Sequence, residues 1–214
     1  MMMKHIALVL LMAALTACEK QQTTALPAQS SMVPASPAEA KPAVASIGPV
    51  TSREPLLNAA PLGIEVGYAN LAGVKEKLGG AAKLQDQGLG LYSGGPKYIS
   101  DGAGLGVDGL SALALVFDNN NILAGVSMTM IPKNPKGMLA QLTGKYQLVE
   151  NGIDNFMNNG YAKLEKGDSW IEIIVPHMSF NMEVRYVTKQ LINDTRRQSA
   201  ENDTRKRQEQ INKM

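Results

Sequence analysis

Hydrophobic and polar positions divide the chain into three stretches. Residues 20–60 carry Pro, Ala, Ser, Gln and Thr without any apolar period, whereas residues 61–187 alternate apolar runs with Gly- or Asn-rich breaks. After residue 188 the chain is mostly polar and charged. Apolar runs bounded by turn residues predict strands, and apolar positions three and four residues apart predict helices. The middle stretch is therefore expected to be the folded domain, and its length suits a single core.

Two helices are predicted in this domain, each preceded by an asparagine that can cap it. Asn70 precedes a helix over 71–78 that ends at Gly79 and Gly80. Asn134 precedes a helix over 135–142 that starts with proline and ends at Gly144. Predicted strands cover 64–66, 83–85, 89–92, 97–100, 113–117, 122–131, 146–149, 160–164, 170–175 and 180–187.

The clearest pattern is the hairpin of 113–117 and 122–131 around a turn at 118–121. A helix followed by a small antiparallel meander is thus expected twice, although the residues themselves show no repeat. We predict an α+β fold: two helix-plus-antiparallel-meander units in one domain over 61–187, with a disordered N-terminal tether and a polar C-terminal helix.

The first seventeen residues have the features of a secretory signal peptide. A basic start at Lys4 and His5 precedes an apolar run over 6–15. That run is shorter than the roughly 20 residues needed to span a bilayer. The exit, Leu15-Thr16-Ala17-Cys18, resembles the lipobox of bacterial lipoproteins. The resemblance implies cleavage before Cys18 and lipidation of its thiol.

The position after the cysteine bears on which membrane holds the protein. Glu19 stands there. By resemblance to the sorting rule of enteric bacteria, an aspartate would favour the inner membrane, whereas Glu19 favours the outer membrane. The expected location is therefore the outer membrane, lipid-anchored and facing the periplasm, with the inner membrane as the less favoured alternative.

Residues 18–60 are predicted to be the lipidated cysteine and a Pro/Ala-rich tether. Their composition cannot bury enough apolar surface to offset the entropy of ordering. As a coil, such a segment spans on the order of 35 Å. The stretch Pro34-Ala35-Ser36-Pro37 offers an alternative interpretation, a Pro-rich ligand for a partner. Because it is a single match, a spacer is favoured over a ligand.

Residues 188–214 are predicted to form a charged C-terminal helix or tail. After Thr188 the chain has seven basic and four acidic residues. Opposite charges four residues apart support a helix; these pairs are Glu201 with Arg205, Asp203 with Arg207, and Glu209 with Lys213. Because the segment has few apolar residues, a solvated helix is favoured. The alternative is a helix whose basic residues contact anionic lipid, peptidoglycan or an acidic partner. Nucleic acid is not expected, because no aromatic platform accompanies the charge.

The start of the domain resembles a known family. Gly67-Tyr68-Ala69-Asn70-Leu71-Ala72-Gly73-Val74 with Leu78-Gly79, then Leu113-Ala114-Leu115-Val116-Phe117-Asp118 and Leu123, is similar to the BamE/SmpA-like outer-membrane lipoprotein domain. The resemblance implies a small helix-plus-meander adaptor fold.

Candidates for catalysis are few. Once the signal peptide is removed, His177 is the remaining histidine, and an acylated Cys18 cannot act as a nucleophile. No Gly-x-Ser-x-Gly elbow is present, and zinc lacks its usual ligand set. His177 is expected in a turn with a satisfied hydrogen bond. Acidic pairs that could hydrolyse a glycan are a further alternative; the candidates are Glu150, Asp154, Glu165, Asp168, Glu172 and Glu183.

Two further patterns have an ordinary structural explanation. Methionines near His177 could bind Cu(I) but are better explained as core; they are Met128, Met130, Met178 and Met182. The run from Gly104 to Gly109 has the spacing of a dinucleotide fingerprint. No strand leads directly into it and no helix follows, so a glycine-rich loop is predicted.

Taken together, these patterns predict a protein without catalytic, cofactor or metal residues. The function expected is a membrane-anchored, non-catalytic binding or assembly module of the bacterial envelope. Its expected partners are the bilayer, through Cys18, and another envelope protein or peptidoglycan. The alternative is a cell-wall or small-ligand or metal-binding protein whose site the sequence does not reveal.

Overall fold

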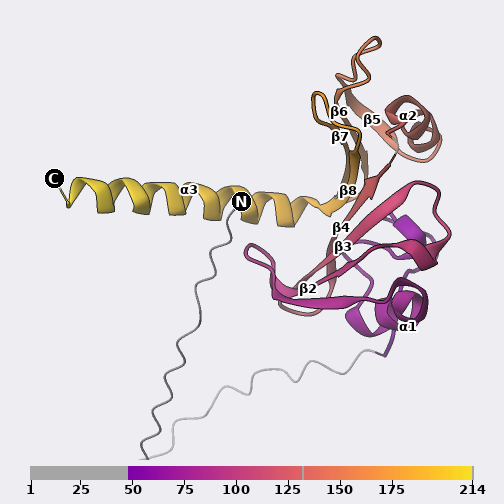
Figure 1. Cartoon of the computed structure of the whole chain (residues 1–214). Helices are drawn as coiled ribbons and strands as arrows, with labels where there is room; N and C mark the ends of the chain where they lie inside the picture. Colours follow the sequence, from indigo (N-terminus) through magenta and orange to yellow (C-terminus); the bar gives the residue numbers. More distant parts are fainter. Residues whose placement is uncertain (1–47, 132, 214) are drawn as a thin grey trace, which may run out of the picture. The chain divides into compact units, whose positions relative to one another are not determined.

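The computed structural model describes residues 48–131 and 133–213, within which lie three α-helices and one eight-stranded antiparallel sheet (Figure 1). The expected α+β class is confirmed. The helices are α1 (Leu71–Ala82), α2 (Pro135–Thr143) and α3 (Lys189–Ile211). The strands are β1 (Gln85–Leu89), β2 (Gly94–Ser100), β3 (Leu110–Asp118), β4 (Leu123–Met130), β5 (Gln147–Asn151), β6 (Gly160–Lys166), β7 (Ser169–Val175) and β8 (Met182–Thr188). The lipobox lies outside the described residues.

The sheet has the order β1-β2-β3-β4-β8-β7-β6-β5, with each neighbouring pair antiparallel. Strands that follow one another along the chain are therefore neighbours, except at the centre of the sheet. There β4 pairs with β8, from Gly125 opposite Val187 to Met130 opposite Met182. This long-range pairing joins the two halves of the sheet, β1–β4 and β5–β8.

One face of the sheet carries the core. Alternate residues of the central strands are buried, as a strand packed on one side requires: Ile171, Ile173 and Val175 in β7, and Met182, Val184 and Tyr186 in β8. Figure 1 shows α1 and α2 on this face, with α2 next to β6 and β7. Complete burial of one large aliphatic side chain contributes roughly 1.5–3 kcal/mol, so these layers supply most of the driving force for folding.

Helix α1 begins where the sequence predicts and continues past its expected end. Asn70 caps it, with the side-chain oxygen accepting from the Gly73 amide at 2.9 Å. The helix runs through Gly79 and Gly80 and ends at Ala82, and the next residue, Lys83, takes the left-handed conformation. The prediction of an end at Gly79 was wrong because Ala82 is buried in the core and its carbonyl accepts from the Ser100 hydroxyl. These contacts outweigh the cost of about 1 kcal/mol for each helical glycine.

Residues 49–60, which composition assigns to the tether, pack on the domain in the structure. Asn58 and Ala59 are buried, and the Ala59 amide donates to the Ser169 hydroxyl at 2.9 Å. The predicted strand over 64–66 is absent from the described fold, where these residues form a loop and turn. Glu65 is fully buried in that loop and accepts hydrogen bonds from the 53–58 segment. The packed part of the chain therefore begins before residue 60.

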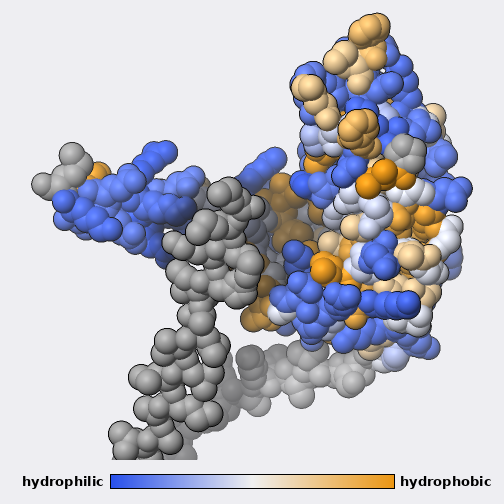
Figure 2. Space-filling model, viewed as in Figure 1, coloured by the Kyte–Doolittle hydropathy of each residue, from blue (hydrophilic) through white to orange (hydrophobic). Residues whose placement is uncertain are grey.

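Helix α3 starts at the end of β8 and is largely exposed (Figures 1 and 2). Thr188 caps it, accepting from the Leu191 amide at 3.2 Å. Gln198 reaches the β1–β2 hairpin, donating to the Tyr92 carbonyl at 3.3 Å. Within the described residues, the expected i,i+4 charge pairs are not formed at ion-pair distance, and Arg205 instead donates to Asn202. Solvent competes effectively for such exposed charges.

Candidate functional site

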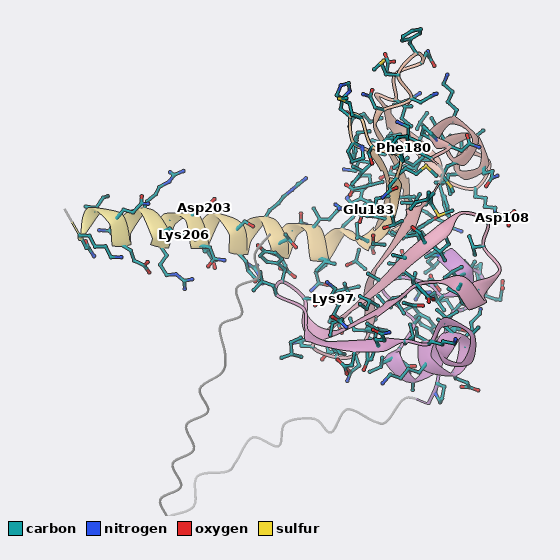
Figure 3. All side chains as sticks on the ribbon, viewed as in Figure 1. Lys97, Asp108, Phe180, Glu183, Asp203 and Lys206 are labelled. Carbon is teal, nitrogen blue, oxygen red and sulfur yellow. The ribbon has the colours of Figure 1, made fainter. Side chains whose placement is uncertain are left out.

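The face of the sheet opposite the core carries the most distinctive group of polar and aromatic side chains. We call this group the open face; its members, from β4, β6, β7 and β8, are Ser127, Tyr161, Lys163, Trp170, Glu172, Glu183 and Arg185. All are partly buried. They alternate with the core residues along each strand, so the pleat alone directs them away from α1 and α2. Figure 3 shows Glu183 on the side of the sheet from which α3 leaves.

A charged network occupies the centre of the open face. Arg185 donates to Glu183 Oε2 at 2.5 Å, and the Ser127 hydroxyl donates to the other carboxylate oxygen. Partial burial alone would raise the pKa of Glu183, but the hydrogen bonds from Arg185 and Ser127 lower it overall. The bond to Glu183 also raises the pKa of Arg185, against its partial burial. Both groups are therefore charged at neutral pH and fixed in position.

Next to this network, the Tyr161 hydroxyl donates a hydrogen bond to Glu172 at 2.9 Å. Glu172 lies opposite Arg185 in the β7–β8 register. Burial, and then the bond to Glu172, raise the pKa of Tyr161 well above its ordinary value. The phenol therefore stays neutral and cannot serve as a base near neutral pH.

Trp170 forms the aromatic part of the open face, between two lysines. The ammonium of Lys163 lies 3.6 Å from the ring centroid, and that of Lys189 lies 4.6 Å away. Lys189 also forms an ion pair with Glu165 at 3.4 Å. Cation–π contacts of this kind hold the ring and the ammonium groups in place. The result is an aromatic platform with positive charge beside it.

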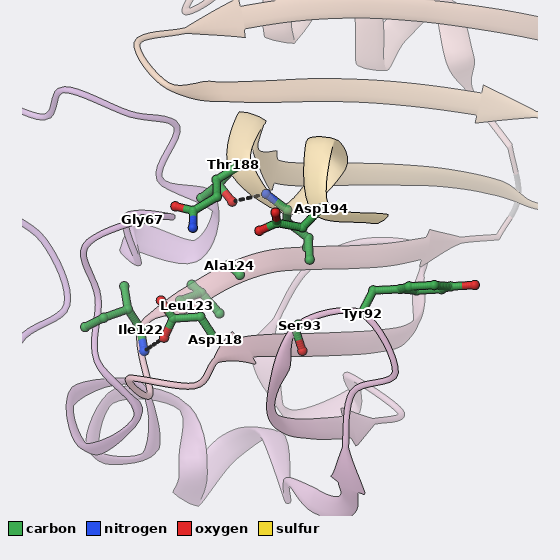
Figure 4. Close-up of a pocket in the computed structure, with 11 residues that line it drawn as sticks. Gly67, Tyr92, Ser93, Asp118, Ile122, Leu123, Ala124, Thr188 and Asp194 are labelled. Carbon is green, nitrogen blue, oxygen red and sulfur yellow. Dashed lines mark hydrogen bonds between the residues drawn. The ribbon is translucent and has the colours of Figure 1, made fainter. Parts of the chain in front are cut away.

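A small pocket lies at the edge of this region, between the first turn of α3, the start of β4 and the β1–β2 hairpin (Figure 4). Its volume is about 100 Å³, whereas small-molecule sites occupy roughly 300–1,000 Å³. Asp118 in its wall accepts from the amides of its own turn, Asn120 and Ile122. Asp194 is bonded to Arg197. The acidic groups are used structurally, and the pocket suits water better than a substrate.

The structure separates the residues proposed for catalysis and copper. His177 lies exposed in the β7–β8 turn, as expected, with its Nδ1 2.7 Å from Asn159 Nδ2. An amide nitrogen can only donate, so Nδ1 accepts. The strand methionines belong to the core: Met128, Met130 and Met182 are buried. Met178 is 85% exposed, so the four thioethers do not converge.

The structure also locates the glycine run and the carboxylates that the sequence suggested as candidates. Gly104 lies in a 3₁₀ turn against the end of α1, where a Cβ would be 2.0 Å from the Ala81 carbonyl oxygen. The glycine run is thus a tight loop that leads into β3. Among the carboxylates, Glu172 and Glu183 share the open face. Within residues 48–131 and 133–213, no cluster of His, Cys, Asp and Glu has a metal-binding arrangement.

Comparison with known proteins gave no match: no family model, curated protein or solved structure is significantly similar to this chain. Among the described helices, none is long and apolar enough to cross a bilayer.

The open face is not evident from the sequence alone. The outward positions of each strand follow from its alternation, but the register that brings Tyr161 to Glu172 is not encoded in any one strand. The signal that was available is the placement of Trp170, Glu172, Glu183 and Arg185 at outward positions between the apolar inward positions of their strands.

Proposed function

We propose that this chain is a lipid-anchored, non-catalytic binding or assembly module of the bacterial cell envelope, which binds a partner protein on its open face. The observation that carries the proposal is the composition of that face: paired charges beside a partly buried aromatic ring, on the neighbouring strands β4, β8, β7 and β6. The lipobox supports an acyl anchor at Cys18, and Glu19 supports an outer-membrane, periplasm-facing position.

The edges of the sheet are less suited to binding than its face. The two edge strands, β1 and β5, have five residues each, and both contain a register shift against their neighbours. Short, bulged edges obstruct the addition of another strand. A partner is therefore more easily accommodated across the open face than along either edge.

The side chains of the open face are already ordered before any partner binds. Arg185, Glu183 and Ser127 hold one another, and Lys163 rests on Trp170. Ordered side chains lose little entropy on association. Trp, Tyr and Arg are also the residue types that contribute most at protein interfaces. Both properties favour recognition of a protein surface over chemistry on a substrate.

The architecture of two units is also part of this proposal. In chain order, α1 precedes the meander β1–β4, and α2 precedes the meander β5–β8. We infer two helix-plus-meander units whose last strands pair at the centre of the sheet, and the first unit resembles the BamE/SmpA-like domain. The open face then spans the junction between the units, which is where a partner would contact both.

Photo-crosslinking in cells tests the proposal. A photoreactive amino acid replaces Thr129, which lies on β4 next to the open face, and in a matched control replaces Glu76, which is exposed on α1. We expect one discrete adduct from position 129 and none from position 76. Arg185→Glu, which breaks the pair with Glu183, should abolish the adduct at 129, whereas His177→Ala should leave it unchanged.

Two results would overturn the proposal. One is equal crosslinking from both positions, or crosslinking at 129 that Arg185→Glu does not reduce. The other is a purified protein that cleaves peptidoglycan or binds copper tightly in a manner dependent on His177.

A further inference from the structure

Four large apolar side chains stand in solvent at one end of the sheet. We call them the apolar tip: Phe156 and Met157 in the β5–β6 loop, and Met178 and Phe180 in the β7–β8 loop. Their exposed fractions are 90%, 50%, 85% and 85% in that order. Figure 2 shows apolar colour over these loops, above β6 and β7. Single exposed apolar residues are ordinary, but four on two adjacent loops are not.

The two loops are joined into one structure. Asn159 of the first loop bonds to His177 of the second at 2.7 Å. Asp154 accepts from the amides of Phe156 at 2.8 Å and Met157 at 2.5 Å, which fixes the turn that presents both side chains. The tip is therefore held exposed by its own hydrogen bonds.

Two lysines border the apolar tip. The Lys133 amide donates to the Phe180 carbonyl at 3.1 Å, and the Lys136 ammonium donates to the Asn155 carbonyl at 2.7 Å. Lys136 also acts on the one carboxyl group of the first loop, Asp154: bonds from the Met157 and Phe156 amides lower its pKa, and the Lys136 charge lowers it further. An apolar projection with a basic border matches the interface of a bilayer that contains anionic lipid.

We propose that the apolar tip inserts into the surface of an anionic bilayer and gives the protein a second membrane contact beside its acyl anchor. A fluid lipid phase accommodates such a convex projection without a matching shape. The proposal extends the proposed function, because the Cys18 anchor would keep the tip close to the membrane. The open face and the apolar tip are separate surfaces, because the hydrogen-bonded network of Glu183 and Arg185 includes no residue of the tip.

Depth-dependent fluorescence quenching tests the insertion. The acylated full-length protein is reconstituted into vesicles of phosphatidylcholine and phosphatidylglycerol with brominated acyl chains. Trp170→Phe removes the native tryptophan, and Phe156→Trp then reports on the tip. The matched control is Leu91→Trp in the same background, since Leu91 is 79% exposed on the β1–β2 hairpin. We expect blue-shifted, strongly quenched emission from position 156 and unquenched emission from position 91.

A second variant measures the energetic contribution of the tip. The unacylated protein, Cys18→Ser with the signal peptide removed, is tested for flotation with the same vesicles. Phe156→Asp with Phe180→Asp is expected to reduce its partitioning by roughly 100-fold, since each buried phenylalanine would contribute at least tenfold. Leu89→Asp with Leu91→Asp should leave partitioning unchanged.

The outcomes distinguish the tip from the anchor. Acylated protein that floats while position 156 stays unquenched overturns the tip and leaves the anchor standing. Unacylated protein that floats with position 156 quenched supports the tip, whether or not Cys18 is lipidated in cells. Flotation that is insensitive to the two Phe→Asp changes overturns the tip as well.

Discussion

The buried carboxylate of Glu65 holds the 53–58 segment on the domain, and its removal should destabilise the fold by about 3 kcal/mol. Oε1 accepts from the amides of Asn58 at 2.9 Å and Leu57 at 3.0 Å, and from Arg53 Nε at 3.3 Å. Oε2 accepts from the Arg53 amide at 3.3 Å. Glu65→Ala would remove all four hydrogen bonds at once.

The expected loss of stability depends on which of the hydrogen-bond donors water can reach once the Glu65 carboxylate is removed. Hydrogen bonds to a charged group contribute about 1.5–3 kcal/mol each when no solvent replaces them. Asn58 is buried, so the loss of its bond should cost about 2 kcal/mol. Leu57 is 54% exposed and Arg53 is partly exposed, so water compensates most of their loss, leaving about 1 kcal/mol together. These contributions sum to the stated 3 kcal/mol.

Urea unfolding monitored by Trp170 fluorescence is the assay. Glu54→Ala is the matched control, because Glu54 is an exposed glutamate in the same segment and its loss should change stability by less than about 0.5 kcal/mol. Arg53→Ala should destabilise Glu65→Ala less than it destabilises the wild type. Both changes break the bond between Arg53 Nε and Glu65, whereas the contact of Arg53 with the Tyr68 ring is lost in either background. A loss below about 1 kcal/mol in Glu65→Ala would show that the segment is not held by this carboxylate.

Three further predictions concern the anchor and the response to pH. Cys18→Ala should release the protein from membranes, and a mutant that stays in the detergent phase on fractionation would contradict this. The pKa of Glu183 is lowered in the fold, so its stabilising effect is present above the ordinary carboxyl pKa and is lost as pH falls through the folded value. Glu183→Gln should therefore reduce the loss of stability between about pH 6 and pH 3, measured by urea midpoints; parallel curves for both proteins would argue against it. Burial raises the pKa of Tyr186, so its neutral form stabilises the fold and that effect is lost as pH rises above the ordinary value of 10.0. Tyr186→Phe should flatten the alkaline decline in urea midpoint, and an unchanged decline would refute this.

Local signals were sufficient for the best-defined elements of the fold. The hairpin predicted from 113–117 and 122–131 corresponds to β3 and β4, and the helix predicted after Asn134 corresponds to α2. In both cases the turn or cap residues adjoin the apolar run. Asn134 accepts from the Gly137 amide at 3.0 Å, the bond expected of its position. Such features depend only on residues a few positions apart.

The errors occur where distant contacts decide the conformation. Ile64, Glu65 and Val66 alternate like a half-exposed strand, yet all three are buried. The alternation misleads because Glu65 points inward, to bind amides supplied by residues 53–58. The same contacts explain why a proline-containing segment without an apolar period belongs to the packed domain. Composition describes what a segment can bury by itself, not what a buried acceptor elsewhere can hold.

The open face could not be predicted for the same reason: contacts between residues far apart in the sequence form it. Its central contact joins Ser127 in β4 to Glu183 in β8, and this requires the pairing of these two strands at the centre of the sheet. An uncovered face is by itself ordinary for an antiparallel sheet, and would be expected to carry small polar residues. What distinguishes this one is that its central strands place ion pairs and Trp170 where water only partly reaches them. Partial desolvation weakens the benefit of such charges to stability, and for this reason we propose that a complementary partner surface covers them.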